Sequence, residues 1–165
     1  MTVVLCECIT INIFASGPGL APHSILEMSA LVIDTPYGKV FHTGDWKLDE
    51  TPVIGTPASA EQLTAIGDEG ILAMVCDSTN VFNDKASGSE ASVHSDLLKH
   101  VAEARGRVVV TTFASNSARL QTLADVAREA GRKLCFAGRS LHKIVEASQA
   151  TGYLKNLPEM VDMEA

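Results

Sequence analysis

Two histidines and two aspartates are the side chains whose types and positions suit catalysis in this chain: His23, His42, Asp45 and Asp77. Each aspartate comes shortly after a strand-like run, so its carboxylate is expected at a sheet edge, where catalytic groups are often held. A carboxylate can bridge two divalent cations about 3.5–4 Å apart, and a neutral imidazole can bind one of them. These residues permit a metal-dependent hydrolase; turn formation and helix capping are the alternative roles.

The segment before Asp45 is expected to form two short strands and a turn. Residues 28–35 and 39–41 are rich in apolar and β-branched side chains, and a Pro/Gly turn at 36–38 separates them. Gly44 comes directly before Asp45 and lets the backbone turn sharply. This arrangement would point the carboxylate out of the sheet.

The run Ile71–Cys76 is continuously apolar, with glycine before it and polar residues after it. Such a run is typical of a strand covered on both faces, as in layered α/β proteins. Asp77 would then lie at the tip of a buried strand, which repeats the arrangement expected for Asp45.

The rest of the chain is expected to be built of strands and helices in alternation. A first strand covers residues 3–14, and a helix begins after Ser59 as its N-cap and ends at Gly67. Further along, the expected order is helix 91–104, strand 107–112, helix 117–130, strand 133–137 and helix 141–150. Strands that alternate with helices over short loops predict βαβ units with parallel pairing, and therefore an α/β fold.

The charge of the chain is unevenly distributed. The net charge of −7 argues against a nucleic-acid-binding protein, and a hydrophobic content of 46% fits a globular one. Residues 107–143, however, carry seven basic and two acidic side chains. Two loops here, 113–116 and 138–140, each open a helix, where backbone N–H groups can hold a phosphate. The basic stretch is interpreted either as solvated helix faces or as a surface for a phosphate-bearing ligand.

Cysteine content and hydropathy bear on the cellular compartment. The four cysteines include no Cys-x-x-Cys pair, and they are expected to be small buried hydrophobes in a reducing cytosol rather than zinc ligands or a disulfide framework. Residues 1–14 are too short a run for a membrane span, and they lack the basic start of an export signal. We therefore expect a cytoplasmic protein with no membrane partner.

Several short motifs stand out by their order and separation. They are His23-Ser24-Ile25, His42-Thr43-Gly44-Asp45-Trp46-Lys47-Leu48-Asp49, Asp77-Ser78-Thr79-Asn80, Ser87-Gly88-Ser89-Glu90, Thr111-Thr112-Phe113-Ala114-Ser115-Asn116-Ser117-Ala118-Arg119, and the stretch from Gly131-Arg132-Lys133 to Gly138-Arg139-Ser140. Together they resemble the motifs of the ribonuclease J family, which belongs to the β-CASP branch of the metallo-β-lactamase superfamily. The resemblance extends from about residue 23 to the C-terminus.

This resemblance implies a fold and a domain organisation. Residues 1–80 would be the C-terminal part of a metallo-β-lactamase αββα sandwich, and residues 81–165 the first βαβ units of a β-CASP domain. The family's earlier His-x-His-x-Asp-His motif does not occur in this sequence, and its two later histidine motifs would lie beyond Ala165. The chain therefore resembles an internal portion of the family's fold.

The resemblance also implies roles for the site residues. His23 would bind one zinc ion, Asp45 would bridge two, and Asp77 would orient a histidine of the site. Such enzymes hydrolyse RNA phosphodiesters by attack of a metal-bound hydroxide, so Asp45 and Asp77 are the expected catalytic residues. His42 is expected to be structural rather than a ligand.

RNA is the partner that the resemblance implies, and the residues expected to contact it are Ser115, Asn116, Arg119 and Arg139. Because two ligands do not hold a dinuclear zinc site, we expect the isolated chain to bind zinc weakly and not to cleave RNA. Exposed sheet edges are expected to favour self-association.

Two other functions fit the sequence. A non-catalytic RNA- or nucleotide-binding α/β module would use the basic stretch 107–143, and its binding would weaken with salt. Another hydrolase of the metallo-β-lactamase fold would act on a small ester or thioester.

Overall fold

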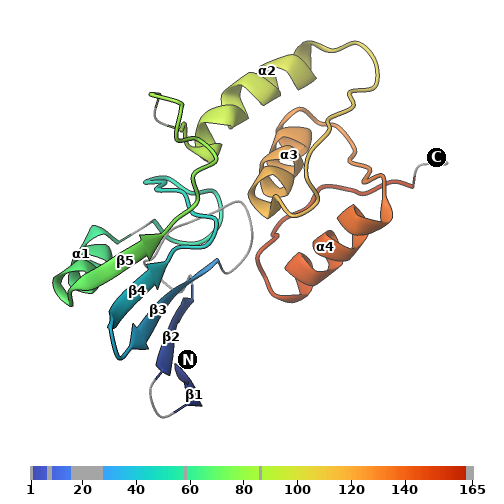
Figure 1. Cartoon of the computed structure of the whole chain (residues 1–165). Helices are drawn as coiled ribbons and strands as arrows, with labels where there is room; N and C mark the ends of the chain where they lie inside the picture. Colours follow the sequence, from blue (N-terminus) through green and yellow to red (C-terminus); the bar gives the residue numbers. More distant parts are fainter. Residues whose placement is uncertain (1, 7–8, 16–27, 58, 86, 163–165) are drawn as a thin grey trace. The chain divides into compact units, whose positions relative to one another are not determined.

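The structure, a computed structural model, describes residues 2–6, 9–15, 28–57, 59–85 and 87–162. The chain forms two compact units (Figure 1). Unit 1 consists of Met1–Glu50 and Gly55–Gly88, and unit 2 consists of Thr51–Ile54 and Ser89–Ala165.

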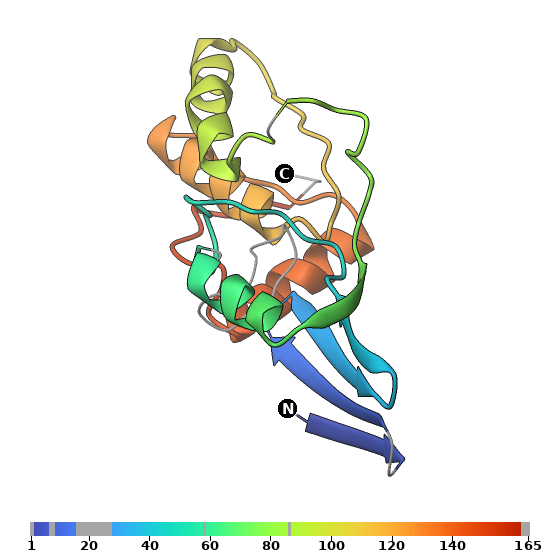
Figure 2. The same cartoon turned by 60° about the vertical axis from the view of Figure 1, so that its left-hand side comes forward.

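Unit 1 is built on a five-stranded sheet whose strands lie side by side in chain order (Figures 1 and 2). The strands are β1 (Thr2–Cys6), β2 (Ile9–Ala15), β3 (Ser29–Thr35), β4 (Gly38–His42) and β5 (Ile71–Val75). Pairing is antiparallel from β1 to β4 and parallel between β4 and β5. The prediction of one strand over residues 3–14 is wrong, because β1 and β2 pair with each other and the apolar alternation does not reveal where the chain reverses.

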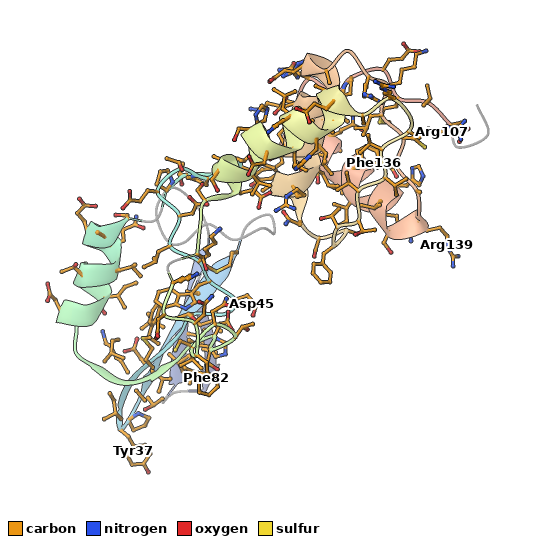
Figure 3. The ribbon with its side chains drawn as sticks, turned by 90° about the horizontal axis from the view of Figure 1, so that it is seen from above. Tyr37, Asp45, Phe82, Arg107, Phe136 and Arg139 are labelled. Atoms are coloured by element: carbon orange, nitrogen blue, oxygen red, sulfur yellow. The ribbon has the colours of Figure 1, made fainter. Side chains whose placement is uncertain are left out.

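The predicted strands before Asp45 are confirmed as the β3–β4 hairpin. The Thr35 hydroxyl stabilises its turn, donating to the Gly38 carbonyl oxygen at 2.7 Å and accepting the Tyr37 amide N–H at 3.2 Å. Gly38 has a φ of 139°, which favours glycine at this position. Tyr37 lies at the tip of the hairpin (Figure 3).

The core of unit 1 lies between the sheet and helix α1 (Ala60–Asp68). Four buried side chains form it: Ala30, Val32, Phe41 and Ile66. Ala30 and Val32 are two positions apart on β3, so they lie on the same face of the strand. This apolar face fixes which side of the sheet α1 covers.

Local hydrogen bonds and charges fix the ends of α1. Ser59 caps the helix as predicted, since its hydroxyl accepts the Gln62 amide N–H at 3.2 Å. The helix ends one residue beyond the predicted Gly67. Just past the helix, Glu69 forms an ion pair with Lys39 of β4, which joins this end of α1 to the sheet.

Strand β5 forms as predicted, but it is not covered on both faces. Leu72, Met74 and Val75 are each at least half exposed. The strand lies at the edge of the sheet, and α1 is the only helix of the described residues that packs against it. An apolar run indicates that a strand is suited to burial. Burial of both faces also requires elements that pack against each face.

Unit 2 consists of helices around a separate core. Its elements are η1 (Glu90–Val93), α2 (His94–Glu103), α3 (Ser117–Glu129) and α4 (Arg139–Ala150), so the three predicted helices are confirmed. The buried core residues are Leu120, Phe136, Val145 and Leu154, of which Phe136 is labelled in Figure 3. Ile54, which precedes the rest of unit 2 in sequence, packs against this core.

The strands predicted at residues 107–112 and 133–137 do not form. Residues 107–112 belong to no helix or strand, and Leu134 makes only an isolated parallel bridge with Met160. The β-branched content that predicted strands is present, but a strand also needs a neighbour for its backbone N–H and C=O groups. The βαβ units predicted over residues 107–150 are therefore wrong, whereas β4, α1 and β5 form such a unit in unit 1, and the fold is a mixed α and β one.

Two of the four cysteines are described with their side chains, and both are exposed. The prediction that Cys76 and Cys135 are buried is wrong, because Cys76 follows an edge strand and Cys135 lies in a segment without a sheet around it. Across the described ranges, none of the helices has the length and apolar character needed to cross a bilayer.

Candidate functional site

Asp45 lies on an exposed bend shortly after β4 (Figure 3). Gly44 has a φ of 66°, which supplies the predicted sharp turn, and a Cβ there would lie 3.3 Å from the Ser29 carbonyl oxygen. His42 fixes the same bend, since its Nδ1 accepts the Gly44 amide N–H at 3.0 Å. His42 therefore has a structural contact, in agreement with the role expected for it.

Asp45 and Asp77 leave the sheet at the same edge. β4 and β5 are parallel neighbours, and the buried Thr43 donates its amide N–H to the Val75 carbonyl oxygen at 3.0 Å. Each aspartate follows this hydrogen-bonded pair by two residues. Parallel strands thus bring both acids to one sheet end, the usual place for a functional site in such sheets.

Asp77 is held by its own loop. Its Oδ1 accepts the Thr79 amide N–H at 2.9 Å and the Thr79 hydroxyl at 2.5 Å. This short-range turn fixes the orientation of the carboxylate. A carboxylate fixed in this way is suited to orienting another polar side chain.

The described residues alone do not fit a zinc centre. They contain no group of three or more His, Cys, Asp or Glu side chains that could hold a metal ion, whereas zinc sites use at least three protein ligands. Of the two predicted ligands, Asp45 is described and His23 lies outside the described residues. The predicted convergence of His23 and Asp45 therefore stays a prediction.

Ser115 and Asn116 form the start of α3. The Asn116 Oδ1 accepts the Arg119 amide N–H at 2.9 Å, so Asn116 is the helix N-cap. The Ser115 carbonyl oxygen accepts the Ser117 amide N–H at 2.9 Å, while Ser115 itself is exposed. Helix capping, the alternative role for such residues, accounts for the Asn116 side chain.

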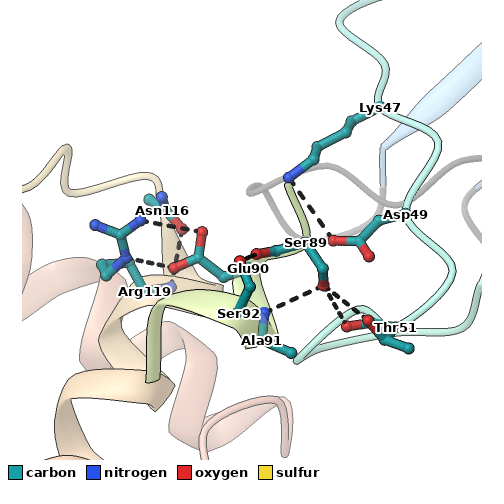
Figure 4. A network of polar contacts seen from close by, with 9 residues as sticks. All are labelled: Lys47, Asp49, Thr51, Ser89, Glu90, Ala91, Ser92, Asn116 and Arg119. Atoms are coloured by element: carbon teal, nitrogen blue, oxygen red, sulfur yellow. Dashed lines mark hydrogen bonds and ion pairs between the residues drawn. The ribbon is translucent and has the colours of Figure 1, made fainter. Parts of the chain in front are cut away.

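Arg119 is held inside unit 2 by Glu90 (Figure 4). The Arg119 Nε and Nη2 both contact the Glu90 carboxylate, with Nη2 3.2 Å from Oε2. The two side chains are only 26% and 15% exposed. Because two nitrogens along one edge of the guanidinium face this carboxylate, fewer N–H groups are left for a phosphate.

A second set of hydrogen bonds joins Ser89 to Thr51 (Figure 4). The Ser89 hydroxyl donates to the Thr51 carbonyl oxygen at 2.8 Å and accepts the Ala91 amide N–H at 3.2 Å. The Ser92 hydroxyl in turn donates to the Ser89 carbonyl oxygen at 2.6 Å. These bonds connect Thr51–Ile54 to the first turn of the helical unit.

Four of the seven basic residues in the stretch 107–143 make contacts within unit 2. The partners are Glu90 for Arg119, Asp125 and the Asn156 carbonyl oxygen for Arg128, the carbonyl oxygens of Ala104 and Gly106 for Arg132, and Glu159 for Lys133. These four contact other residues of the helical unit, a role that neither interpretation of the stretch had named. Arg107, Arg139 and Lys143 are exposed and remain candidates for a phosphate-bearing ligand, and Figure 3 labels the first two.

Glu90 is the residue that sequence reasoning missed. It lies 29 positions before Arg119, so no helical or strand periodicity links the two. The available signal was that two of the motifs carry opposite charges. Glu90 comes directly after the capping Ser89 in one motif, and Arg119 lies within the predicted helix in the other. Such a signal is weak without coordinates.

The chain is related in sequence to known proteins. Residues 105–165 match the family model described as "Ribonuclease J, beta-CASP domain". Curated proteins named Ribonuclease J match from Sinorhizobium meliloti, 43% identical over 82% of this chain, and from Corynebacterium glutamicum, 46% identical over 81%. The protein of the same name from Thermus thermophilus is 38% identical over 86% of this chain. This chain is ribonuclease J-like.

The ribonuclease J-like chain spans a quarter or less of these relatives: 24%, 18% and 25% of their lengths, in the same order. The resemblance expected from the motifs is thus confirmed, over about four fifths of the chain. The part that matches the β-CASP model, residues 105–165, lies within unit 2.

Proposed function

We propose that this chain is a portion of a ribonuclease J-type enzyme that hydrolyses RNA, and that it carries two acids of the active site, Asp45 and Asp77. The similarity to proteins named Ribonuclease J carries the proposal, at 38–46% identity over 81–86% of the chain. The common sheet edge from which the two acids project supports it.

In this proposal the two acids have different roles. Asp45 is exposed and, together with His23, would bind zinc, of which a complete site holds two ions. Asp77 has a carboxylate oriented by Thr79 and would position a histidine of the site. Residues 1–80 would belong to a metallo-β-lactamase sandwich and residues 81–165 to a β-CASP domain, in a cytoplasmic enzyme.

Because the resemblance assigns only two zinc ligands to this chain, His23 and Asp45, the isolated chain should bind zinc weakly and leave RNA intact. Zinc titration followed by calorimetry, and a cleavage assay on a labelled RNA with zinc added, measure these two properties. Cleavage that Asp45→Ala abolishes and Asp84→Ala does not would contradict the expected inactivity. Asp84 is a suitable control because it is an exposed aspartate in a separate loop.

A chimera tests the enzymatic function itself. The matched 135 residues of this chain would replace their counterpart in the Sinorhizobium meliloti relative. RNA hydrolysis should persist in the chimera, Asp77→Asn should lower it by about 10–100-fold, as loss of an orienting partner does, and Asp45→Ala should lower it further. A folded chimera whose activity is indifferent to both substitutions would refute the assigned roles.

A second candidate function is RNA binding without catalysis, favoured by the exposure of Arg139, Lys143 and Arg107. Binding of a single-stranded RNA would then fall steeply with salt and survive Asp45→Ala. Arg139→Ala should weaken it, whereas Arg128→Ala, which removes an arginine paired with Asp125, should have a smaller effect. Ser115 and Asn116 would contribute at the start of α3, and Arg119 less because of Glu90.

A further inference from the structure

Phe82 is the most exposed large apolar residue in the part of the chain that the structure describes, with 98% of its surface open to solvent (Figure 3). A single exposed apolar side chain is common on protein surfaces and by itself points to no ligand. Two features of its loop set Phe82 apart: the backbone around it is fixed, and the loop starts beside Asp77.

Hydrogen bonds fix the backbone on both sides of Phe82. The Val81 amide N–H donates to the Ser78 carbonyl oxygen at 3.0 Å, and the Asn83 amide N–H donates to the Asn80 carbonyl oxygen at 2.9 Å. These bonds close two overlapping turns, and Phe82 is the third residue of the second turn. An aromatic ring on a backbone that is already ordered loses little conformational entropy when a ligand binds.

The loop that carries Phe82 leaves the sheet at the end of β5 that is followed by Asp77 (Figure 1). Neighbouring Cα atoms lie about 3.8 Å apart and the ends of a turn less than about 7 Å apart, so the Cα atoms of Asp77 and Phe82 are at most about 15 Å apart. Asp45 leaves the sheet at the same end, because β4 and β5 are parallel. A single strand of RNA bound at the two acids would therefore have a nucleotide within reach of the ring.

The residues around Phe82 favour a nucleobase over a protein partner. Val81, 67% exposed, is the only other large apolar side chain of residues 77–85, and exposed polar residues follow the ring: Asn83, Asp84 and Lys85. A protein interface needs a contiguous apolar patch, which two neighbouring side chains do not supply. One face of an aromatic ring is sufficient for a stacked base. Because Asp84 and Lys85 have opposite charges, the loop offers stacking rather than a net positive charge.

We propose that the Phe82 ring stacks on an unpaired base of the RNA strand that binds at the sheet edge of Asp45 and Asp77. This inference rests on the proposed function and adds to it a substrate contact that is separate from the two acids. Stacking on an aromatic ring requires no particular base, because every base has a flat π-face. The contact does require a base that is free of its neighbours, so it would be made with single-stranded RNA and not with a duplex.

Binding of a fluorescently labelled single-stranded RNA to the 165-residue chain, followed by anisotropy, tests the contact. Phe82→Ala and Phe82→Leu should each weaken binding about tenfold, whereas Phe82→Trp should keep it, because stacking needs an aromatic ring. An abasic strand with the same phosphates should bind the wild type and Phe82→Ala equally. Tyr37→Ala is the matched control, since Tyr37 is an aromatic residue, 89% exposed, that precedes β4 whereas Asp45 follows it. This variant should bind RNA as the wild type does.

A salt titration separates stacking from phosphate contacts. Added salt should weaken RNA binding by the wild type and by Phe82→Ala in parallel, so that the ratio of the two Kd values stays near tenfold. Full binding by Phe82→Leu, an equal loss on the abasic strand, or a chain that binds no RNA would overturn the inference. The proposed function fails by a different result, namely hydrolysis in the chimera that is indifferent to Asp45→Ala and Asp77→Asn.

Discussion

The two units of this chain are held together by different means. In unit 1, continuous backbone ladders join β1 to β5 in chain order. In unit 2, side chains make the longest connections, since Arg119 reaches Glu90 over 29 positions and Ser89 reaches Thr51 over 38, and the backbone adds one isolated bridge between Leu134 and Met160. Unit 2 also contains Arg107–Phe113, a strand-like segment without a ladder.

The difference shows how the availability of neighbours decides which elements form. Hairpin strands find their partner a few residues away, and a helix satisfies its own backbone. A parallel strand must find its partner after a long crossover, as β5 does with β4. Residues 107–112 have the composition of a strand, but no strand of the described residues pairs with them, and side-chain contacts make most of the long connections in unit 2.

Among substitutions that should destabilise one unit and not the other, Phe41→Ala is expected to have the largest effect. Phe41 is in the core of unit 1, and truncation of a buried phenylalanine costs about 3–5 kcal/mol. Hydrogen exchange should accelerate in β3, β4 and α1 while the helices of unit 2 keep their protection. Equal loss of protection in both units would show that they unfold as one.

Leu120→Ala is the reciprocal experiment in unit 2. Leu120 is 1% exposed, and the substitution should lower the free energy of unfolding of this unit by about 2–5 kcal/mol. Chemical denaturation followed by hydrogen exchange would measure it. Leu48→Ala, at a position 59% exposed, removes the same atoms and should change stability little. A similar effect from both substitutions would refute the core assigned to unit 2.

Glu90→Gln should have a smaller effect, confined to unit 2. The Glu90–Arg119 pair is largely buried, so its loss should cost about 1–2 kcal/mol, between the values for exposed and fully buried pairs. Lys133→Gln is the control, since its pair with Glu159 is mostly exposed. If thermal unfolding shows the same shift for both variants, the buried pair does not hold the unit as described.

The smallest expected effect is a pH dependence limited to unit 1. The hydrogen bond to Glu69 raises the pKa of Lys39 above its usual 10.5. A raised pKa in the folded state means that the pair stabilises unit 1 at neutral pH and that this contribution is lost as pH rises through the folded pKa. The stability of the wild type should therefore decline above pH 10.5 more steeply than that of Lys39→Met, and parallel curves would exclude the effect.

The sequence alone was sufficient to predict those elements whose signals lie within a few residues of each other. The Ser59 cap, the β3–β4 turn and the periodicity of α3 each depend on residues a few positions apart. Most of the errors concern partners that are distant or not found among the described residues, namely those for both faces of β5 and for the strands at 107–112 and 133–137, whereas the strand predicted over 3–14 is wrong because a local chain reversal left no signal. An apolar pattern indicates that burial of a segment would be favourable. Which elements pack against that segment can be seen only in the folded structure.

The candidate site was predictable to a similar extent. The pattern of a strand followed by an acid predicted that Asp45 and Asp77 each follow a strand, and the parallel pairing of β4 with β5 brings these two strand ends to one edge of the sheet. The contact of Arg119 with Glu90 was not predictable, because it joins two helical segments across 29 positions. Local charge counts for residues 107–143 therefore overstated the number of arginines open to a ligand.

The assignment of Thr51–Ile54 to unit 2 has a consequence for anyone who wishes to express the units apart. The polypeptide enters unit 2 at Thr51, returns to unit 1 at Gly55 and enters unit 2 again at Ser89. No single cut in the gene therefore yields two self-sufficient polypeptides. A recombinant unit 2 that starts at Ser89 would lack Ile54 in its core and Thr51 beside its first cap, so those four residues would have to be grafted back through a designed linker.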